Sequence, residues 1–170
     1  MTEHIFEIPW SRFQALTPAE KVPYLMQDDG APYHTLFAQQ FGAELLDAMA
    51  RLANEIRTIA KTRAGTDFLK TQVSHKRAML YFSQPSSRTF LSFVSACQIL
   101  GVQTGEVRDT LISSEFKGES REDSVRTFSS YFDLIIMRTP EKGLAEHMAW
   151  VLSNSDHPRP IINAGSGQDE

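Results

Sequence analysis

The part of the chain after residue 77 alternates short apolar runs with stretches whose apolar residues recur at helical spacing. The short runs predict strands at 78–82, 134–137 and 160–164, and more weakly at 102–107, where Gly105 interrupts the run. The stretches between them predict helices over 87–100, after Ser120 and from Pro140 onward. Strands alternating with helices favour an α/β fold, here a parallel sheet of about four strands with helices on both faces, in three layers.

The part before residue 77 lacks this alternation. Prolines at positions 9, 18, 23 and 32 break any long element, so we expect residues 1–33 to form an irregular N-terminal arm. From 35 to about 63 the apolar residues recur at threes and fours, which predicts one helix, and 67–73 is expected to be a short link. The predicted organisation is an arm over 1–33 followed by a single domain over 34–170.

Composition narrows the class of protein. A chain of 170 residues suits a single domain, and a net charge of −4 gives no basic surface of the kind that binds nucleic acid. The sequence lacks an apolar run long enough to span a membrane, and its first ten residues do not resemble a signal peptide. We therefore expect a cytoplasmic protein. Cys97, the sole cysteine, lies on an apolar helical face and is expected to be a core residue.

The most informative stretch, 81–93, reads as a strand end, a tight turn and the first turn of a helix. Pro85 ends the strand, and Ser86 and Ser87 are good N-cap residues. Together with Arg88 and Thr89, they place hydroxyls and a guanidinium where backbone N–H groups and the helix dipole favour an anion. A serine-capped helix with an exposed arginine explains the same stretch without a ligand.

Other polar stretches follow the predicted strands at the same edge of the sheet. They are 138–140, which begins with Arg138, and the glycine-flanked turn at 163–167. Ligands of parallel α/β sheets bind outside the carboxyl ends of the strands, so these stretches favour a site for a small phosphorylated ligand. The histidines His34, His75, His147 and His157 lack metal-ligand spacing, and we expect no metal site.

These stretches together resemble the carbamoyltransferases. Ser86-Ser87-Arg88-Thr89 followed by Ser92-Phe93 is similar to the family's Ser-Thr-Arg-Thr-Arg-x-Ser-Phe signature. Three further segments resemble its Lys-Gly-Glu segment, its Asp-Ala-Ile-Val-x-Arg-x-Pro strand end and its Pro-Val-Ile-Asn-Ala-Gly strand, at 117–127, 133–140 and 160–165. Lys117 before Gly-Glu and the Asn-Ala-Gly turn resemble the aspartate branch more than the ornithine branch, which stays as an alternative.

The resemblance implies transfer of a carbamoyl group from carbamoyl phosphate to L-aspartate, in pyrimidine biosynthesis, without a metal or organic cofactor. It implies that Ser86, Ser87, Arg88, Thr89 and Arg138 bind the phosphate, and that Thr89 and Arg138 also reach the carbonyl oxygen. It further implies that Ser113 and Lys117 act in a neighbouring subunit's site. The expected assembly is a homotrimer with sites at subunit interfaces, and regulatory or pathway subunits are further candidate partners.

Some features depart from the family pattern. Gln84 stands where the family has Glu or Lys, and Phe90 stands where it has a second arginine. The sequence ends at Glu170, before the position of the family's His-Pro-Thr-Gln segment and its aspartate-binding domain. We therefore expect the 170-residue chain by itself to be inactive. These departures keep open a second hypothesis, a non-catalytic homologue that binds ligand or assembles with an active partner.

Overall fold

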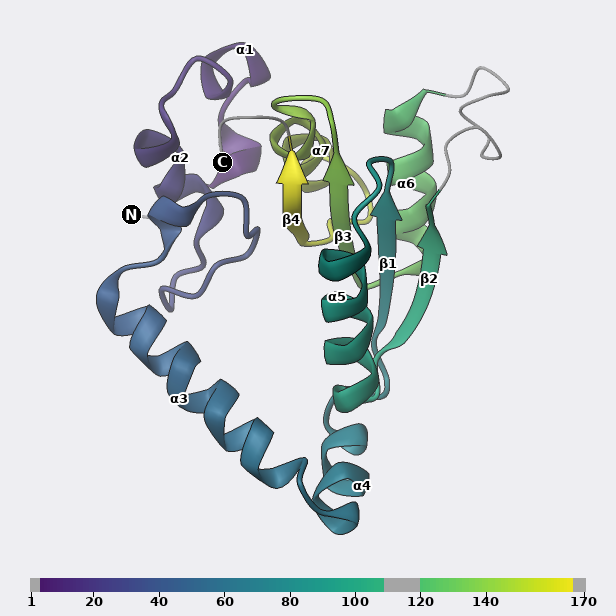
Figure 1. Cartoon of the computed structure of the whole chain (residues 1–170). Coiled ribbons are helices and arrows are strands. Elements are labelled where there is room, and N and C mark those ends of the chain that lie inside the picture. Colours follow the sequence, from purple (N-terminus) through teal and green to yellow (C-terminus); the bar gives the residue numbers. More distant parts are fainter. Residues whose placement is uncertain (1–3, 109–119, 167–170) are drawn as a thin grey trace.

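A parallel sheet forms the centre of the molecule (Figure 1). The computed structural model describes residues 4–108 and 120–166. Within them the sheet has four strands in the order β2-β1-β3-β4, all parallel. They are β1 (Arg77–Phe82), β2 (Gln103–Val107), β3 (Leu134–Thr139) and β4 (Ile161–Ser166). The predicted strands and the predicted α/β fold are confirmed.

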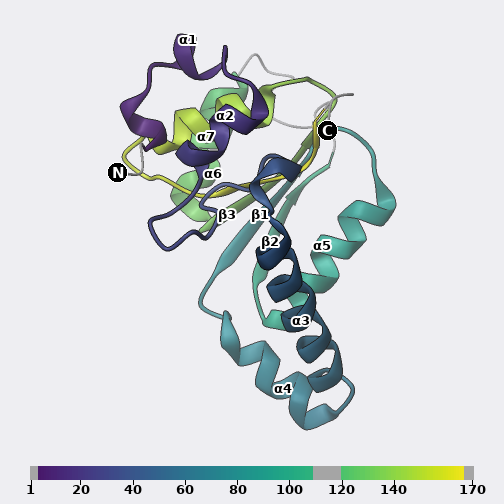
Figure 2. The same cartoon turned by 90° about the vertical axis from the view of Figure 1, so that its left-hand side faces the viewer.

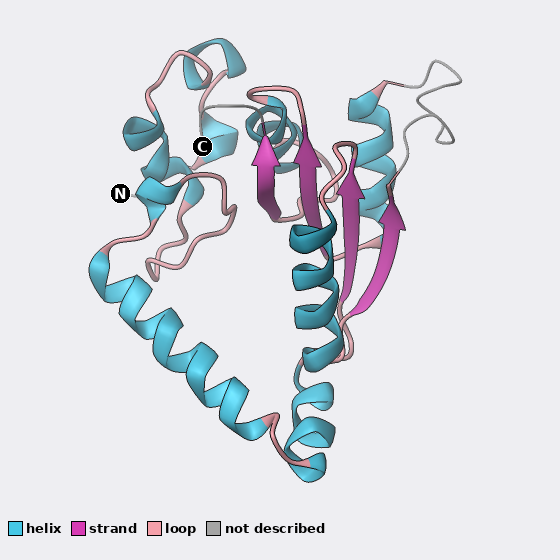
Figure 3. Cartoon of the chain, viewed as in Figure 1, coloured by secondary structure: helices cyan, strands magenta, loops and turns pink. Residues whose placement is uncertain are grey.

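Helices cover both faces of this sheet, as predicted (Figure 3). Successive residues of β1 point to opposite faces. Met79 and Tyr81 pack in one core cluster with residues of α6 (Arg121–Tyr131) and α7 (Leu144–Ser153). Leu80 and Phe82 pack in a second cluster with α5 (Ser87–Leu100). Cys97 is buried in this second cluster, as its position on the helix predicted.

Local capping explains where these helices begin and end. α5 ends at Gly101, whose φ of 78° is the left-handed conformation that glycine adopts without strain. α6 follows Ser120, whose Oγ accepts the Asp123 N–H at 3.1 Å. The prediction that Pro140 opens a helix was wrong in position, because α7 begins at Leu144 after a turn that contains Gly143. Its predicted inward residues, Leu144, Met148 and Val151, are buried.

Short helices occur in the N-terminal segment, over residues 4–33, where the sequence predicted an irregular arm without helices. The segment contains η1 (Ile5–Glu7), α1 (Trp10–Phe13) and α2 (Pro18–Leu25). Pro9 precedes α1 and Pro18 occupies the first turn of α2, where a proline has no hydrogen bond to lose, whereas Pro23 lies inside α2 close to its end at Leu25. Thr17 caps the same helix by accepting the Glu20 N–H.

This segment also packs into the core of the sheet. Ile5, Ile8, Phe13 and Leu25 are buried in the cluster that contains β1 and β3 residues. The Trp150 indole N–H of α7 donates to the Ile8 carbonyl at 2.8 Å. Lys21 forms an ion pair with Glu146 of α7, and the two side chains are 6% and 18% exposed. The segment is therefore joined to α7 by apolar and polar contacts.

The predicted helix over 35–63 begins later than expected. Residues 34–37 are held extended against β4, where the Thr35 N–H donates to the Ile161 carbonyl at 2.8 Å. The Gln40 side chain accepts the Leu36 N–H at 2.7 Å and donates to the His34 carbonyl at 2.6 Å, which fixes this segment. The short helix η2 (Ala38–Gln40) and then α3 (Ala43–Ile59) follow.

The predicted link over 67–73 was also wrong, since it lies mostly within α4 (Arg63–Gln72). Thr62 starts this helix by accepting the Gly65 N–H at 3.0 Å. Figures 1 and 2 show α3 leading away from the sheet to α4. None of the α3 residues is buried, and Leu46, Met49 and Leu52 are about half exposed. The apolar periodicity therefore predicted the helix correctly but not its exposure.

His34 is a buried structural histidine. Its Nδ1 accepts the Ile161 N–H at 3.1 Å, and its Nε2 lies 2.8 Å from the Ser153 hydroxyl. An imidazole whose Nδ1 accepts carries its proton on Nε2, so the ring donates to Ser153. Burial lowers the pKa of His34 to about 3, which keeps the ring neutral near pH 7.

Candidate functional site

The candidate site lies at the carboxyl ends of β1 and β3. β1 continues through α5 to β2 on one side, while β3 lies on its other side, so the chain direction diverges between β1 and β3. In open α/β sheets this is the position of the ligand crevice. The Ser83 N–H and hydroxyl contact the Arg138 carbonyl at 2.9 and 3.3 Å. These bonds hold the turn after β1 against the end of β3.

The start of α5 has the geometry of an anion site. Ser86 is the N-cap, with an extended backbone, and its carbonyl accepts the Phe90 N–H at 3.1 Å. Its side chain makes no capping hydrogen bond. The first N–H groups of a helix have no partner within it, and the helix dipole gives them a positive potential. The turn can therefore offer both these N–H groups and the serine hydroxyls to an anion.

A small pocket of about 220 Å³ opens at this helix start. Its lining residues come from the end of β1, the turn, α5 and the residue after β2: Phe82, Gln84, Pro85, Ser86, Ser87, Phe90 and Arg108. Of the predicted site residues, Ser86 and Ser87 thus line this pocket. Thr89 lies on the first turn of α5 and is half-buried, but it does not line this pocket.

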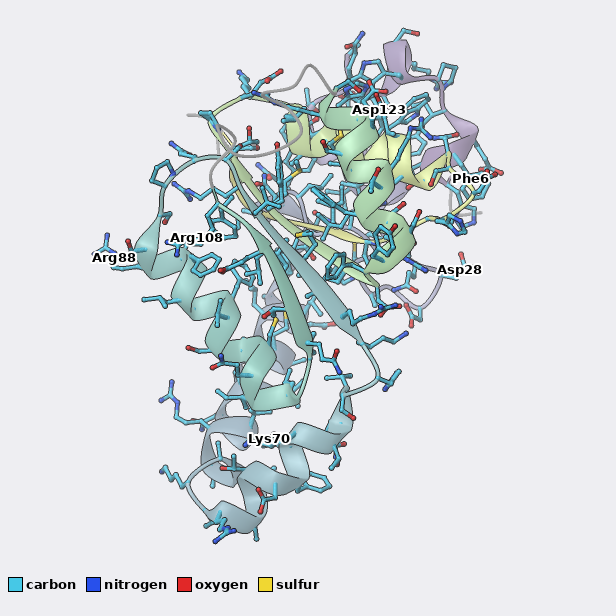
Figure 4. All side chains as sticks on the ribbon, turned by 90° about the vertical axis from the view of Figure 1, so that its right-hand side faces the viewer. Phe6, Asp28, Lys70, Arg88, Arg108 and Asp123 are labelled. Carbon is cyan, nitrogen blue, oxygen red and sulfur yellow. The ribbon has the colours of Figure 1, made fainter. Side chains whose placement is uncertain are left out.

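Arg88 points away from the pocket. Figure 4 shows its side chain extending outward from the start of α5, and the residue is exposed. An exposed arginine can change rotamer at low cost, so its predicted contact with a phosphate requires such a change. The sequence placed Arg88 at the right helix terminus but could not give the direction of its side chain.

Arg138 is fixed at the end of β3. Its Nη1 donates to the Ala164 carbonyl at 2.8 Å. Its Nε is buried and lacks an acceptor among the described residues. A buried donor without a partner is costly, which fits a group that meets a ligand. Arg138 is not one of the residues that line the 220 Å³ pocket.

The last part of β4, where the sequence predicted a turn from residue 163, is instead strand and is shaped around Arg138. Gly165 has a φ of +125°, and a Cβ added there would lie 2.2 Å from Arg138 Nη1. The Asn163 side chain supports this part of the strand, because its Oδ1 accepts the Gly165 N–H at 3.0 Å and its Nδ2 donates to Ser166 Oγ at 3.1 Å. The Asn-Ala-Gly segment therefore leaves space for the guanidinium of Arg138.

Arg108 is the pocket residue that the sequence prediction missed. It follows a strand whose prediction was weak, and its guanidinium carbon lies 4.2 Å from the centre of the Phe90 ring. The alternation of side chains along β2 could have identified it, because continuing that alternation puts residue 108 on the face of the sheet that α5 covers. Ser113 and Lys117, predicted to act in a neighbouring site, lie outside the described residues.

Over residues 4–108 and 120–166, we find no group of three or more His, Cys, Asp or Glu side chains that could hold a metal ion. Among the helices in those ranges, none combines the length and apolar character needed to cross a membrane.

A family profile and curated proteins match most of this chain. The profile of the family described as aspartate/ornithine carbamoyltransferase, carbamoyl-P binding domain, matches residues 33–170. Multifunctional protein pyr1-3 of Dictyostelium discoideum is 39% identical over 137 residues, which cover 81% of this chain and 6% of that protein. The chloroplastic aspartate carbamoyltransferase of Arabidopsis thaliana is 39% identical over 136 residues, covering 78% of this chain and 32% of that protein.

Solved structures agree with these sequence relatives. Aspartate transcarbamoylase from Trypanosoma cruzi, in complex with carbamoyl aspartate and phosphate, has a TM-score of 0.68 at 31% identity, covering 79% of this chain and 41% of that one. The catalytic subunit of M. jannaschii aspartate transcarbamoylase has a TM-score of 0.62 at 31% identity, covering 81% and 42%. The chain thus spans less than half of each relative. It belongs to the aspartate/ornithine carbamoyltransferase family, in which residues 33–170 form the carbamoyl-phosphate-binding domain.

Proposed function

We propose that this chain binds carbamoyl phosphate and provides the carbamoyl-phosphate domain of an aspartate carbamoyltransferase. The observation that carries the proposal is the start of α5. There the family motif Ser86-Ser87-Arg88-Thr89 occupies a helix N-terminus whose N-cap side chain makes no capping bond. The T. cruzi relative supports the ligand, because it was solved in complex with carbamoyl phosphate.

The proposed reaction transfers the carbamoyl group to L-aspartate. The amine nitrogen of aspartate forms a bond to the carbonyl carbon of carbamoyl phosphate and gives up a proton. The bond from that carbon to the bridging oxygen breaks, and its electron pair leaves with the phosphate. The products are N-carbamoyl-L-aspartate and inorganic phosphate, in an early step of pyrimidine biosynthesis. The assignment to pyrimidine biosynthesis is supported by the names of the relatives.

Negative charge grows on the carbonyl oxygen and on the leaving phosphate, so fixed donors contribute most to catalysis. In the proposed roles, Ser86, Ser87 and Arg88 bind the phosphate, while Thr89 and Arg138 donate to the carbonyl oxygen. The proposed role of Arg138 is supported by its Nε, which has no acceptor among the described residues. Loss of one such donor lowers the rate on the order of a hundredfold to a thousandfold.

We further propose a homotrimer in which Ser113 and Lys117 enter the site of the neighbouring subunit, with L-aspartate bound by a domain beyond these 170 residues. A head-to-tail contact repeated three times closes such a ring. The test is to mix inactive Arg88→Ala and Lys117→Ala forms of a chain that carries both domains. Shared sites regain part of the activity on subunit exchange, whereas confirmed exchange without activity contradicts them.

The cytoplasm is the proposed compartment. Relatives named chloroplastic make an organelle the alternative, and cell fractionation distinguishes the two. A second candidate function is a ligand-binding homologue without catalysis. Gln84 and Phe90 favour it, because both line the pocket at positions where the family pattern has charged residues. Ornithine in place of aspartate is the remaining alternative for the acceptor.

Calorimetry with carbamoyl phosphate tests the proposed ligand directly. We expect the 170-residue chain to bind it weakly, and Arg138→Ala to lower the affinity. His157→Ala is the matched control, since His157 is exposed. Equal affinities for the two variants contradict the site. The 170 residues by themselves should form no carbamoyl-aspartate, and measurable formation contradicts the assignment of the aspartate site to a further domain.

A further inference from the structure

Arg108 lies over an aromatic ring at the mouth of the 220 Å³ pocket. Its guanidinium carbon is 4.2 Å from the centre of the Phe90 ring, which is within the range of a cation–π contact. Arg108 makes no hydrogen bond or ion pair with another described residue. Its charge is therefore not neutralised by a carboxylate in that part of the chain.

The strand order brings Arg108 to this position. Val107 packs in the core cluster on the α6 side of the sheet. The next residue must point to the opposite face, which α5 covers. β2 pairs with β1 in parallel, with Tyr81 opposite Val107, so residue 108 lies beside the end of β1. Figure 4 shows Arg108 beside the first part of α5, on the side away from Arg88.

Phe90 provides a rigid support for this arginine. The ring is 5% exposed and packs edge-on against Phe82, with centroids 5.3 Å apart and an interplanar angle of 88°. Phe82 belongs to β1 and is buried. The ring therefore has little freedom to move, and a guanidinium stacked on it loses less conformational entropy when it binds an anion.

We propose that Arg108 is a further cation that binds the phosphoryl group in this chain, together with Arg88, and that the Phe90 ring positions it. It takes over the charge that the family motif places at position 90, where this chain has phenylalanine. Arg108, the hydroxyls of Ser86 and Ser87 and the N–H groups at the start of α5 then surround one anion of phosphate size. A planar guanidinium can donate two hydrogen bonds to such a group.

This inference rests on the proposed function. The probe is phosphonoacetamide, a stable analogue of carbamoyl phosphate with a methylene group in place of the bridging oxygen. We expect Arg108→Ala to weaken its binding about tenfold to a hundredfold, as for the loss of a charged hydrogen-bond partner. Arg108→Lys should restore part of the affinity. Arg51→Ala, which removes the same charge from the exposed helix α3, should leave the affinity unchanged.

The role of the ring is tested separately. Phe90→Leu keeps the apolar volume and should weaken binding about twofold to fivefold, which corresponds to one exposed cation–π contact. The same change should have no further effect in Arg108→Ala, because its effect acts through Arg108. An NMR signal of the Arg108 Nε–H, assigned by its absence in Arg108→Ala, should shift when phosphonoacetamide is added.

The outcomes distinguish this inference from the proposed function. If Arg108→Ala binds like the parent chain while Arg138→Ala loses affinity, the phosphate site stands and the role of Arg108 is overturned. If the effects of Phe90→Leu and Arg108→Ala are additive, the ring does not position the arginine. If the parent chain does not bind phosphonoacetamide at all, both the inference and the proposed function are overturned.

Discussion

Gly165→Ala tests whether the glycine near the end of β4 makes room for Arg138. The added methyl group would lie 2.2 Å from Arg138 Nη1 and 3.0 Å from its Cζ, so the side chain must move. Movement removes its 2.8 Å hydrogen bond to the Ala164 carbonyl, a loss of about 1 kcal/mol. The φ of +125° adds backbone strain of about 1–3 kcal/mol for any residue but glycine. We expect the free energy of unfolding to fall by about 2–4 kcal/mol.

Gly143→Ala is the matched control for this variant. Gly143 also has a positive φ, of 77°, but a Cβ there meets nothing within 4 Å. Gly143→Ala should therefore lower the free energy of unfolding only through backbone strain, by about 1–2 kcal/mol, and leave anion binding unchanged.

The assays are urea unfolding and calorimetry with phosphonoacetamide. Gly165→Ala should bind the analogue at least about tenfold more weakly, because Arg138 is displaced. An affinity equal to that of Gly143→Ala would refute the reasoning that the glycine serves Arg138.

Further predictions concern the core. Burial lowers the pKa of His34 from 6.5 to about 3. Between pH 6.5 and about pH 3, the His34 ring is therefore protonated in the unfolded chain but not in the folded one. The free energy of unfolding should therefore fall as the pH drops from 6.5 towards 3, by up to about 1.4 kcal/mol per pH unit, and urea unfolding of His34→Gln should lack this contribution. Lys21→Met should lower the free energy of unfolding, measured in urea, by about 3 kcal/mol, because Glu146 is left without its partner. Adding Glu146→Gln should recover much of this loss. No recovery would contradict the pairing. Burial also raises the pKa of the Cys97 thiol, so a thiol reagent should label it only after unfolding, and rapid labelling of the folded chain would show that it is accessible.

The sheet and the helices that cross it could be predicted because their signals are local. The apolar run at 134–137 and the cap at Ser120 fix their elements without distant contacts. The N-terminal segment and the stretch 34–42 could not be predicted in the same way. Their conformations depend on partners far along the chain, such as the Ile161 carbonyl for Thr35 and Glu146 for Lys21.

The same distinction applies to the candidate site. Ser86 and Ser87 were found because the motif and the helix start lie in one short stretch. Arg108 was missed because its role depends on the ring of Phe90, which a parallel strand pairing brings near it. The outward direction of Arg88 is a rotamer choice, and residue spacing carries no information about it.

The central claim is that an anion binds at the start of α5. Its most direct test is an amide NMR titration of the ¹⁵N-labelled chain with inorganic phosphate. We predict that the largest shifts occur at the amides of 86–90, with smaller shifts at Arg138 and Gly165. A second pocket, of about 500 Å³, is lined by Tyr24 and Tyr33 of the N-terminal segment. Shifts concentrated at that pocket, or no saturable shift at 86–90, would contradict the claim.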